Sequence, residues 1–259
     1  ENFKRKLENV DFILLSPGIS IKNSLFKKNL EKQKNKIITD LDLLYIQNPN
    51  LKSIVVTGTN GKSTTCKLIE HLLKKSGRNV KLGGNIGKPV LTFNYSDNTI
   101  FVIEASSFQL AHSKFIKPNY AILLNISNDH LDWHGSYNNY INSKFKIFSL
   151  QKKKDFSLIK NKKFLSFYNR KKLGGKLKLL TSKKYTSIKN KIKNDYLRSE
   201  ANFENMIFVY EISILFKIKK SFFIKYMNSF KGLEHRQEIF FKKNDITFIN
   251  DSKATSFEA

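Results

Sequence analysis

The sequence predicts an α/β fold with a mainly parallel sheet, because short apolar segments alternate with segments of helical periodicity. Helices are predicted over 62–75, which Gly77 ends, and over 137–148. Strands are predicted at four apolar segments, which are residues 53–57, 79–82, 100–104 and 120–126. Strands and helices that alternate in this way form parallel sheets, and functional residues usually follow the carboxyl ends of such strands.

The N-terminal side of this central unit gives a second, shorter pattern. Residues 10–15 form an apolar run that predicts a buried strand, and the turn residues 16–18 end it. Residues 19–49 are mostly polar, with Leu and Ile at helical intervals, which predicts helices that lead to a linker near 47–50. We therefore expect a domain boundary close to residue 48.

The C-terminal side ends in a new structural unit. Residues 151–193 are rich in lysine and contain short β-like pieces such as 164–167, but no catalytic motif. The pattern beyond them predicts two helices and a hairpin, at 202–217, 221–230, 237–241 and 246–249. Because Gly232 interrupts the helical pattern, the hairpin is expected to begin a further domain.

The composition is that of a basic globular protein. Lys and Arg number 47 against 21 Asp and Glu among 259 residues, a net charge of +26 that attracts polyanions in general. The lysines are scattered, however, and no zinc-finger, aromatic RNA-binding or helix-turn-helix pattern accompanies them. A solvated basic surface is therefore the favoured interpretation, and no nucleic-acid partner is predicted.

The cysteine content and the chain ends bear on location. Cys66 is the only cysteine, which excludes an intrachain disulfide and suits a reducing cytoplasm. No apolar run approaches the length that spans a bilayer, so no membrane insertion is predicted. The start at Glu1 shows no signal peptide and no initiator methionine, and we expect both ends to lie within a longer protein.

A glycine-rich loop with the sequence TGTNGKST, residues 57–64, lies between a predicted strand and a predicted helix. Its backbone N–H groups and the helix N-terminus suit a phosphate, so ATP is the predicted ligand. In this interpretation Lys62 neutralises the β and γ phosphates, while Ser63, with Thr64, meets a bridging Mg²⁺. The loop is a short variant, because the common pattern GxxxxGK[ST] requires a glycine where Val56 stands.

Three further residues are candidates for chemistry, and each has a plainer interpretation. Glu104 ends a predicted strand beside the loop, where it forms either a Mg²⁺ ligand with Ser63 or an ion pair at the strand end. His130 follows the next strand and could ligate a second metal, although a lone histidine is often structural. Lys144 is, on composition alone, one of many helical lysines.

The motifs taken together resemble the Mur ligase family. Four of them occur in order, GTNGKST at 58–64, GGNIGKP at 83–89, EASSFQL at 104–110 and NDHLDWHGS at 128–136. Three flanking motifs resemble the branch of that family that adds D-glutamate to UDP-N-acetylmuramoyl-L-alanine in peptidoglycan biosynthesis, and they are SPGIS at 16–20, GLEHRQE at 232–238 and INDSKATS at 249–256.

The resemblance implies a role for each matching position. Ser63 and Glu104 would hold one Mg²⁺ ion, and His130 and Lys144 would hold a second. The segment SKFKIF at 143–148 matches a family motif, and this match makes Lys144 the lysine that the family carries as a carbamate. The implied catalytic residues are Lys62, His130 and Lys144. The implied ATP-binding residues are Gly58, Thr59, Asn60, Gly61, Lys62, Ser63, Thr64, Asn205, Arg236 and Asp251. The implied substrate-binding residues are Ser16, Gly18, Asn85, Lys253 and Thr255.

The resemblance also implies a domain plan and a mechanism. Residues 1–48 would end a Rossmann-like UDP-binding domain, 49–233 would form the central ATP-binding domain, and 234–259 would begin a Rossmann-like C-terminal domain. ATP would phosphorylate the substrate carboxylate, and D-glutamate would attack the acyl phosphate on a monomeric enzyme. Two alternatives stay open: another amide ligase of the same superfamily, such as one adding L-alanine, and a non-catalytic module that binds nucleotide or nucleic acid.

Overall fold

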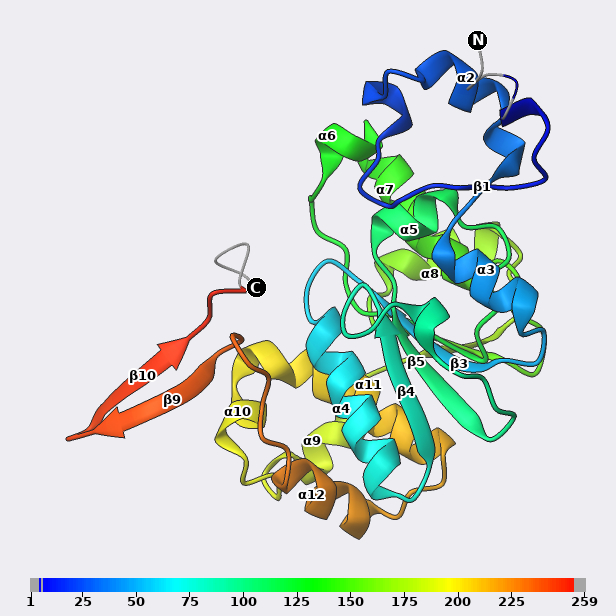
Figure 1. Ribbon diagram of the computed structural model, residues 1–259. Helices are drawn as coiled ribbons and strands as arrows, with labels where there is room; N and C mark the ends of the chain where they lie inside the picture. The colour runs from blue at the N-terminus through cyan, green and yellow to red at the C-terminus, as the bar shows by residue number, and fades with distance from the viewer. Residues whose placement is uncertain (1–4, 6, 254–259) are drawn as a thin grey trace.

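The computed structural model describes residue 5 and residues 7–253 and contains a parallel sheet at its centre (Figure 1). The sheet has six strands in the order β4-β5-β3-β6-β7-β8, and every neighbouring pair is parallel. The strands are β3 (Lys52–Thr57), β4 (Asn79–Gly84), β5 (Thr99–Glu104), β6 (Tyr120–Leu123), β7 (Phe156–Ile159) and β8 (Lys176–Leu179). The predicted α/β class is confirmed.

Helices cover both faces of the sheet (Figure 1). On one face lie α4 (Lys62–Lys75), α9 (Lys183–Lys189), α10 (Asp195–Arg198), α11 (Glu200–Leu215) and α12 (Lys220–Asn228). On the other lie α3 (Asp40–Gln47), α5 (Ser107–His112), α7 (Tyr137–Phe145) and α8 (Lys163–Arg170). Side chains alternate along a strand, so Ile54 and Val56 join the first core while Val55 joins the second.

The N-terminal segment forms a small unit beside α5 and α6 (Leu131–His134) (Figure 1). It contains the parallel pair β1 (Ile13–Leu14) and β2 (Ile37–Ile38), with α2 (Lys27–Lys32) between them, and has its own apolar cluster. Helix α3 follows, and its Leu41, Leu44 and Tyr45 pack in the core of the central sheet. Helix α3 therefore packs with the central unit, although it precedes residue 48. The domain boundary at residue 48 stays a prediction.

The C-terminal residues form the antiparallel hairpin of β9 (Glu238–Lys243) and β10 (Ile246–Asn250), which projects from the rest of the chain (Figure 1). Both strands are largely exposed, including the side chains of Phe240 and Ile249. The predicted hairpin is confirmed. Within the described residues, no helix is long and apolar enough to cross a bilayer.

The structure corrects four local predictions. Residues 164–167 are not β-like but belong to helix α8, where Phe164 and Tyr168 are buried one turn apart. The strand predicted over 10–15 is only Ile13–Leu14, and the strand predicted over 120–126 ends at Leu123. The helix predicted over 137–148 ends at Phe145 and continues as a 3₁₀ turn.

Candidate active site

The loop between β3 and α4 has the shape of a phosphate-binding loop. Gly61 has a φ of 80°, and a Cβ there would lie 2.2 Å from Oδ1 of Asn205, so the position requires glycine. Gly58 passes close to the end of β6, because a Cβ there would lie 2.9 Å from Cβ of Leu124. Helix α4 begins immediately afterwards at Lys62, which places a helix N-terminus where an anion would bind.

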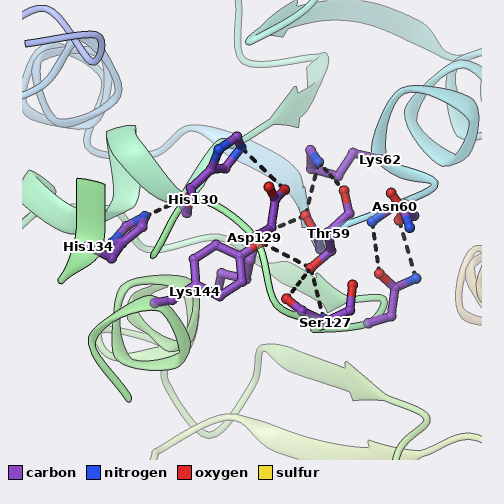
Figure 2. Close-up of polar contacts among 12 residues, drawn as sticks. Thr59, Asn60, Lys62, Ser127, Asp129, His130, His134 and Lys144 are labelled. Atoms are coloured by element: carbon purple, nitrogen blue, oxygen red, sulfur yellow. Dashed lines mark hydrogen bonds and ion pairs between the residues drawn. The ribbon is translucent and has the colours of Figure 1, made fainter. Parts of the chain in front are cut away.

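Residues that follow β6 hold this loop in place (Figure 2). The backbone N–H of Thr59 donates to the carbonyl oxygen of Asn125 at 3.0 Å. The backbone N–H of Asn60 donates to Oδ1 of the Asn125 side chain at 2.9 Å. The hydroxyl of Thr59 accepts from the backbone N–H of Ser127 at 3.0 Å and lies 3.0 Å from the Tyr140 hydroxyl. The loop is therefore held by backbone and side-chain hydrogen bonds from residues that follow β6.

Lys62 lies against the loop that it follows. Its Nζ donates to the carbonyl oxygens of Gly58 at 3.0 Å and Thr59 at 2.7 Å. Burial lowers the pKa of Lys62, and the nearby carboxylates of Glu104 and Asp129 oppose that effect. Because its Nζ lies against the loop, Lys62 is placed to neutralise the phosphates of a nucleotide bound there.

Glu104 is buried at the carboxyl end of β5, beside the end of β3. Its Oε1 accepts a hydrogen bond from Nδ2 of Asn85 at 2.8 Å. Its Oε2 is buried and has no hydrogen-bond partner among the described residues. A buried carboxylate oxygen without a donor is costly, and it suits a hard cation such as Mg²⁺.

Lys144 is buried on α7 and reaches the same loop. Its Nζ donates to the carbonyl oxygen of Gly58 at 2.7 Å and lies 4.6 Å from the centre of the Tyr140 ring. Burial holds the pKa of Lys144 well below the usual range of a lysine, and the charge of Lys62 lowers it further. Both amines thus share the Gly58 carbonyl, which separates Lys144 from the surface lysines of the chain.

His130 directly precedes α6, has a φ of 51° and is half-exposed. Its Nε2 lies 3.3 Å from Oδ2 of Asp129, and its ring packs on Phe108 with centroids 4.7 Å apart. Behind it His134 is buried, with Nε2 3.0 Å from the Ser107 hydroxyl, and burial lowers the pKa of His134 to about 4 (Figure 2). His134 is thus a neutral packing residue, whereas His130 can face a ligand.

No cluster of three His, Cys, Asp or Glu side chains able to hold a metal occurs within residue 5 and residues 7–253. A metal bound to this part of the chain would therefore take at most two ligands of those types. The other ligands would have to come from hydroxyls, a modified lysine, a bound phosphate or water. This donor set fits Mg²⁺, which binds through few protein carboxylates.

A cavity of about 370 Å³ opens beside the phosphate loop. The predicted nucleotide residues Asn60, Gly61, Thr64, Asn205, Arg236 and Asp251 all line it. Asn205 is already used within the protein, since its Oδ1 accepts from the Thr65 hydroxyl at 3.2 Å and its Nδ2 donates to Asn202 at 3.1 Å. Asn205 therefore shapes the wall of the cavity and holds α4 against α11.

A second cavity, of about 570 Å³, lies on the other side of Arg236. Two predicted substrate residues, Asn85 and Lys253, line it together with Ser63. Arg236 borders both cavities, and its Nη2 donates to the Ser63 hydroxyl at 3.4 Å. The phosphate loop thus lies between two cavities, and each cavity could hold one ligand.

Two predicted substrate residues lie apart from these cavities, and one lies outside the described residues. Ser16 and Gly18 occupy the turn after β1, where the Ser16 carbonyl accepts from Ile19 N–H at 3.0 Å, and neither lines the two cavities. Thr255 is outside the described part of the chain. Sequence reasoning missed Asn125 and Tyr140, although a polar residue directly after an apolar strand was a usable signal for Asn125.

The chain is similar to known proteins over most of its length. Residues 56–222 match the family described as the Mur ligase middle domain. A UDP-N-acetylmuramoylalanine--D-glutamate ligase of Natranaerobius thermophilus is 34% identical over 98% of this chain and 61% of its own length. A protein of the same name from Rickettsia bellii is 35% identical over 97% of this chain and 60% of its own length. The chain thus spans about three fifths of these relatives.

Solved structures share the fold. The MurF ligase of Thermotoga maritima, solved in complex with ADP, has a TM-score of 0.61 at 17% identity and covers 84% of this chain and 59% of its own. The MPL ligase from Neisseria meningitides, described as a UDP-N-acetylmuramate:L-alanyl-gamma-D-glutamyl-meso-diaminopimelate ligase, has a TM-score of 0.62 at 16% identity, over 89% of this chain and 82% of its own. At such identities the likeness concerns the fold alone.

Proposed function

Because the chain belongs to the Mur ligase family, we propose that its protein joins D-glutamate to UDP-N-acetylmuramoyl-L-alanine with ATP. The reaction would be a step of peptidoglycan biosynthesis, carried out in the cytoplasm by a monomer. The observation that carries the proposal is the meeting of two amines, that of the buried Lys144 and that of the partly buried Lys62, with a buried carboxylate at one loop. Lys62 and Lys144 share the carbonyl of Gly58, and Oε2 of Glu104, near both amines, has no hydrogen-bond partner in the part of the chain that the structure describes.

ATP is proposed to bind across the loop and the first cavity. The phosphates would accept hydrogen bonds from backbone N–H groups at the N-terminus of α4, with Lys62 as their counter-charge. The nucleoside would occupy the cavity that Asn205, Arg236 and Asp251 line. Support comes from the size of this cavity and from its position directly beside Gly61.

Ser63 and Glu104 are proposed to hold one Mg²⁺, and His130 with Lys144 a second. The first assignment is supported by Oε2 of Glu104, which finds no hydrogen-bond partner within residue 5 and residues 7–253. When bound, the two ions would withdraw charge from the phosphoryl oxygens during transfer. Lys144 would act as a carbamate: its neutral amine attacks CO₂, an N–C bond forms and a proton leaves, which gives an anionic oxygen ligand. The lowered pKa of Lys144 supports this, because only the unprotonated amine can react.

The proposed reaction proceeds in two steps. A carboxylate oxygen of the first substrate attacks the γ phosphorus, the bond to the β-phosphate oxygen breaks, and ADP leaves. The amine of D-glutamate then attacks the acyl carbon and loses a proton, and the tetrahedral intermediate expels inorganic phosphate. Lys62 would neutralise the transferring phosphoryl group, and Arg236, which contacts Ser63 beside the loop, would face the same charge.

The two substrates are proposed to meet in the second cavity. Asn85, whose amide also contacts Glu104, would bind the UDP-sugar substrate, and Ser16 and Gly18 would bind it farther along in the N-terminal unit, residues 1–48. Lys253 and Thr255 would contact D-glutamate where the C-terminal unit, 234–259, joins the central one, 49–233. Support comes from Asn85 and Lys253, which line one cavity although they are far apart in the sequence.

The proposal predicts strict dependence on D-glutamate. The product of the complete reading frame is expected to release phosphate from ATP only when Mg²⁺, UDP-N-acetylmuramoyl-L-alanine and D-glutamate are all present. Parallel reactions would contain L-glutamate, L-alanine or a diamino acid instead, each with phosphate release as the measurement. Release with one of those amino acids would assign the protein to another branch of the family, and no release with any of them would support a non-catalytic module.

A further inference from the structure

Asn125, which lies just after β6, makes three hydrogen bonds to the phosphate loop. Its backbone carbonyl accepts from Thr59 N–H at 3.0 Å. Its side-chain Oδ1 accepts from Asn60 N–H at 2.9 Å, and its Nδ2 donates to the Asn60 carbonyl at 3.3 Å. The amide thus pairs with both backbone groups of Asn60, and it can do so in only one of its two orientations.

Glu204, on helix α11, stabilises that orientation of the Asn125 amide. Its Oε2 accepts a hydrogen bond from Nδ2 of Asn125 at 3.1 Å, and its Oε1 accepts from Nζ of Lys160 at 3.2 Å. A carboxylate can only accept, so Nδ2 of Asn125 must face Glu204 and Oδ1 must face the N–H of Asn60. Lys160, which follows β7, holds the carboxylate from its other side.

We propose that Glu204 is a positioning residue of the phosphate loop. Through Asn125 it fixes the backbone of Asn60, and with it the turn that leads into the N-terminus of α4, where the β and γ phosphates of the nucleotide are proposed to bind. This inference rests on the proposed binding of ATP. It assigns a role to a residue that lies 79 positions from Asn125 in the sequence and comes from the helix on the far side of the cavity, which both residues line.

A glutamine at position 204 weakens the support for Asn125 without changing the size of the side chain. Two donors face position 204, Nδ2 of Asn125 and Nζ of Lys160. A glutamine has one oxygen that accepts and one NH₂ group that donates, so it cannot turn an acceptor toward each of them. Glu204→Gln is therefore expected to raise the dissociation constant for ATP about tenfold. AMP, which has no β or γ phosphate, is expected to bind as it does to the unchanged chain, and the unfolding midpoint is expected to stay the same.

Titration calorimetry on the 259-residue chain, with Mg²⁺, would measure ATP and AMP binding to each variant. Asp195→Asn is the matched control, because it removes the same charge from an exposed residue of the neighbouring helix α10 and leaves the loop contacts intact. The ratio of the two dissociation constants is the decisive quantity. Only a residue that acts on the phosphate loop changes that ratio, whereas general loosening of α11 weakens both ligands.

A reversed pair gives a second, independent test. Asn125→Asp places two carboxylates face to face and is expected to weaken ATP binding more than Glu204→Gln. In the double variant, which combines Glu204→Gln with Asn125→Asp, the amide at position 204 can donate to the carboxylate at position 125. That carboxylate can still accept from the backbone N–H of Asn60. The ATP affinity of the double variant is therefore expected to recover relative to Asn125→Asp alone.

The outcomes separate this inference from the function on which it rests. If the unchanged chain binds no ATP, both the positioning role and the proposed function are wrong. If the unchanged chain binds ATP and Glu204→Gln binds it equally well, the positioning role alone is wrong. Equal weakening of ATP and AMP, or a double variant no better than Asn125→Asp, would also overturn the positioning role.

Discussion

Replacing Glu104 by glutamine is expected to lower kcat on the order of 10³-fold while the fold is kept. Glutamine retains the shape and can still accept from Asn85, but it loses the charge of the buried Oε2, which has no donor among the described residues. A neutral amide binds Mg²⁺ poorly, so the charge on the transferring phosphoryl group would be less well stabilised. Steady-state rates measured against Mg²⁺ concentration would show the loss and a higher Mg²⁺ requirement.

The control for this variant is Asp97→Asn, which removes a charge from an exposed turn where Oδ1 accepts from the Tyr95 hydroxyl. Its rates are expected to stay within about twofold, because surface changes of this kind have small effects. Should Glu104→Gln keep full activity at every Mg²⁺ concentration, the metal assignment of Glu104 would be wrong.

Replacing Lys144 by methionine is expected to abolish turnover, on the order of 10³-fold or more, with no loss of stability. The methionine fills the same buried space, and it avoids the cost of burying an amine. What disappears is the only group on α7 that contacts the Gly58 carbonyl and could carry a carbamate. Phosphate release and the thermal unfolding midpoint would be measured together, with ¹³C NMR of the chain in ¹³CO₂ to detect the carbamate carbon.

Lys146→Met provides a matched comparison for Lys144→Met. Lys146 lies two residues on, and burial lowers its pKa to about 8, but its Nζ contacts the carbonyl of Ala111 instead of the phosphate loop. Its replacement is expected to leave the rate within a few-fold and to leave the carbamate signal intact. A carbamate signal that survives in Lys144→Met, or is lost in Lys146→Met, would show that the modified lysine is not Lys144.

Much of the central fold could be predicted because its elements carry strong local patterns. Helix α4 begins and ends at the predicted residues, since its apolar face is regular and a glycine follows it. Strand β5 ends at Glu104 as predicted, because a single carboxylate interrupts a fully apolar run. Such signals depend only on neighbouring residues, which is why one sequence suffices to read them.

The parts that failed depend on distant contacts. Strand β8 alternates lysine with leucine, which is a strand pattern, but its four residues are too few to distinguish it from the lysine-rich segments around it. Residues 164–167 contain two phenylalanines that suit a strand, but burial of Phe164 with Tyr168 favours a helix. Tertiary packing decides such short segments.

The site shows the same division. Lys62 and Glu104 could be placed from their positions at the ends of elements, whereas Lys144 could be chosen only through family resemblance. Its burial and its contact with Gly58 depend on how α7 packs across the loop, 86 residues away in sequence. The pairing of Glu204 with Asn125 was invisible for the same reason.

Transfer of oxygen from substrate to phosphate tests the central claim most directly. UDP-N-acetylmuramoyl-L-alanine labelled with ¹⁸O in its terminal carboxylate would be incubated with ATP, Mg²⁺, D-glutamate and the product of the complete reading frame. If the carboxylate attacks the γ phosphorus at the phosphate loop, the released phosphate carries one ¹⁸O atom, which mass spectrometry detects. Phosphate without label would mean that water attacks ATP, and the acyl-phosphate mechanism proposed for this site would be wrong.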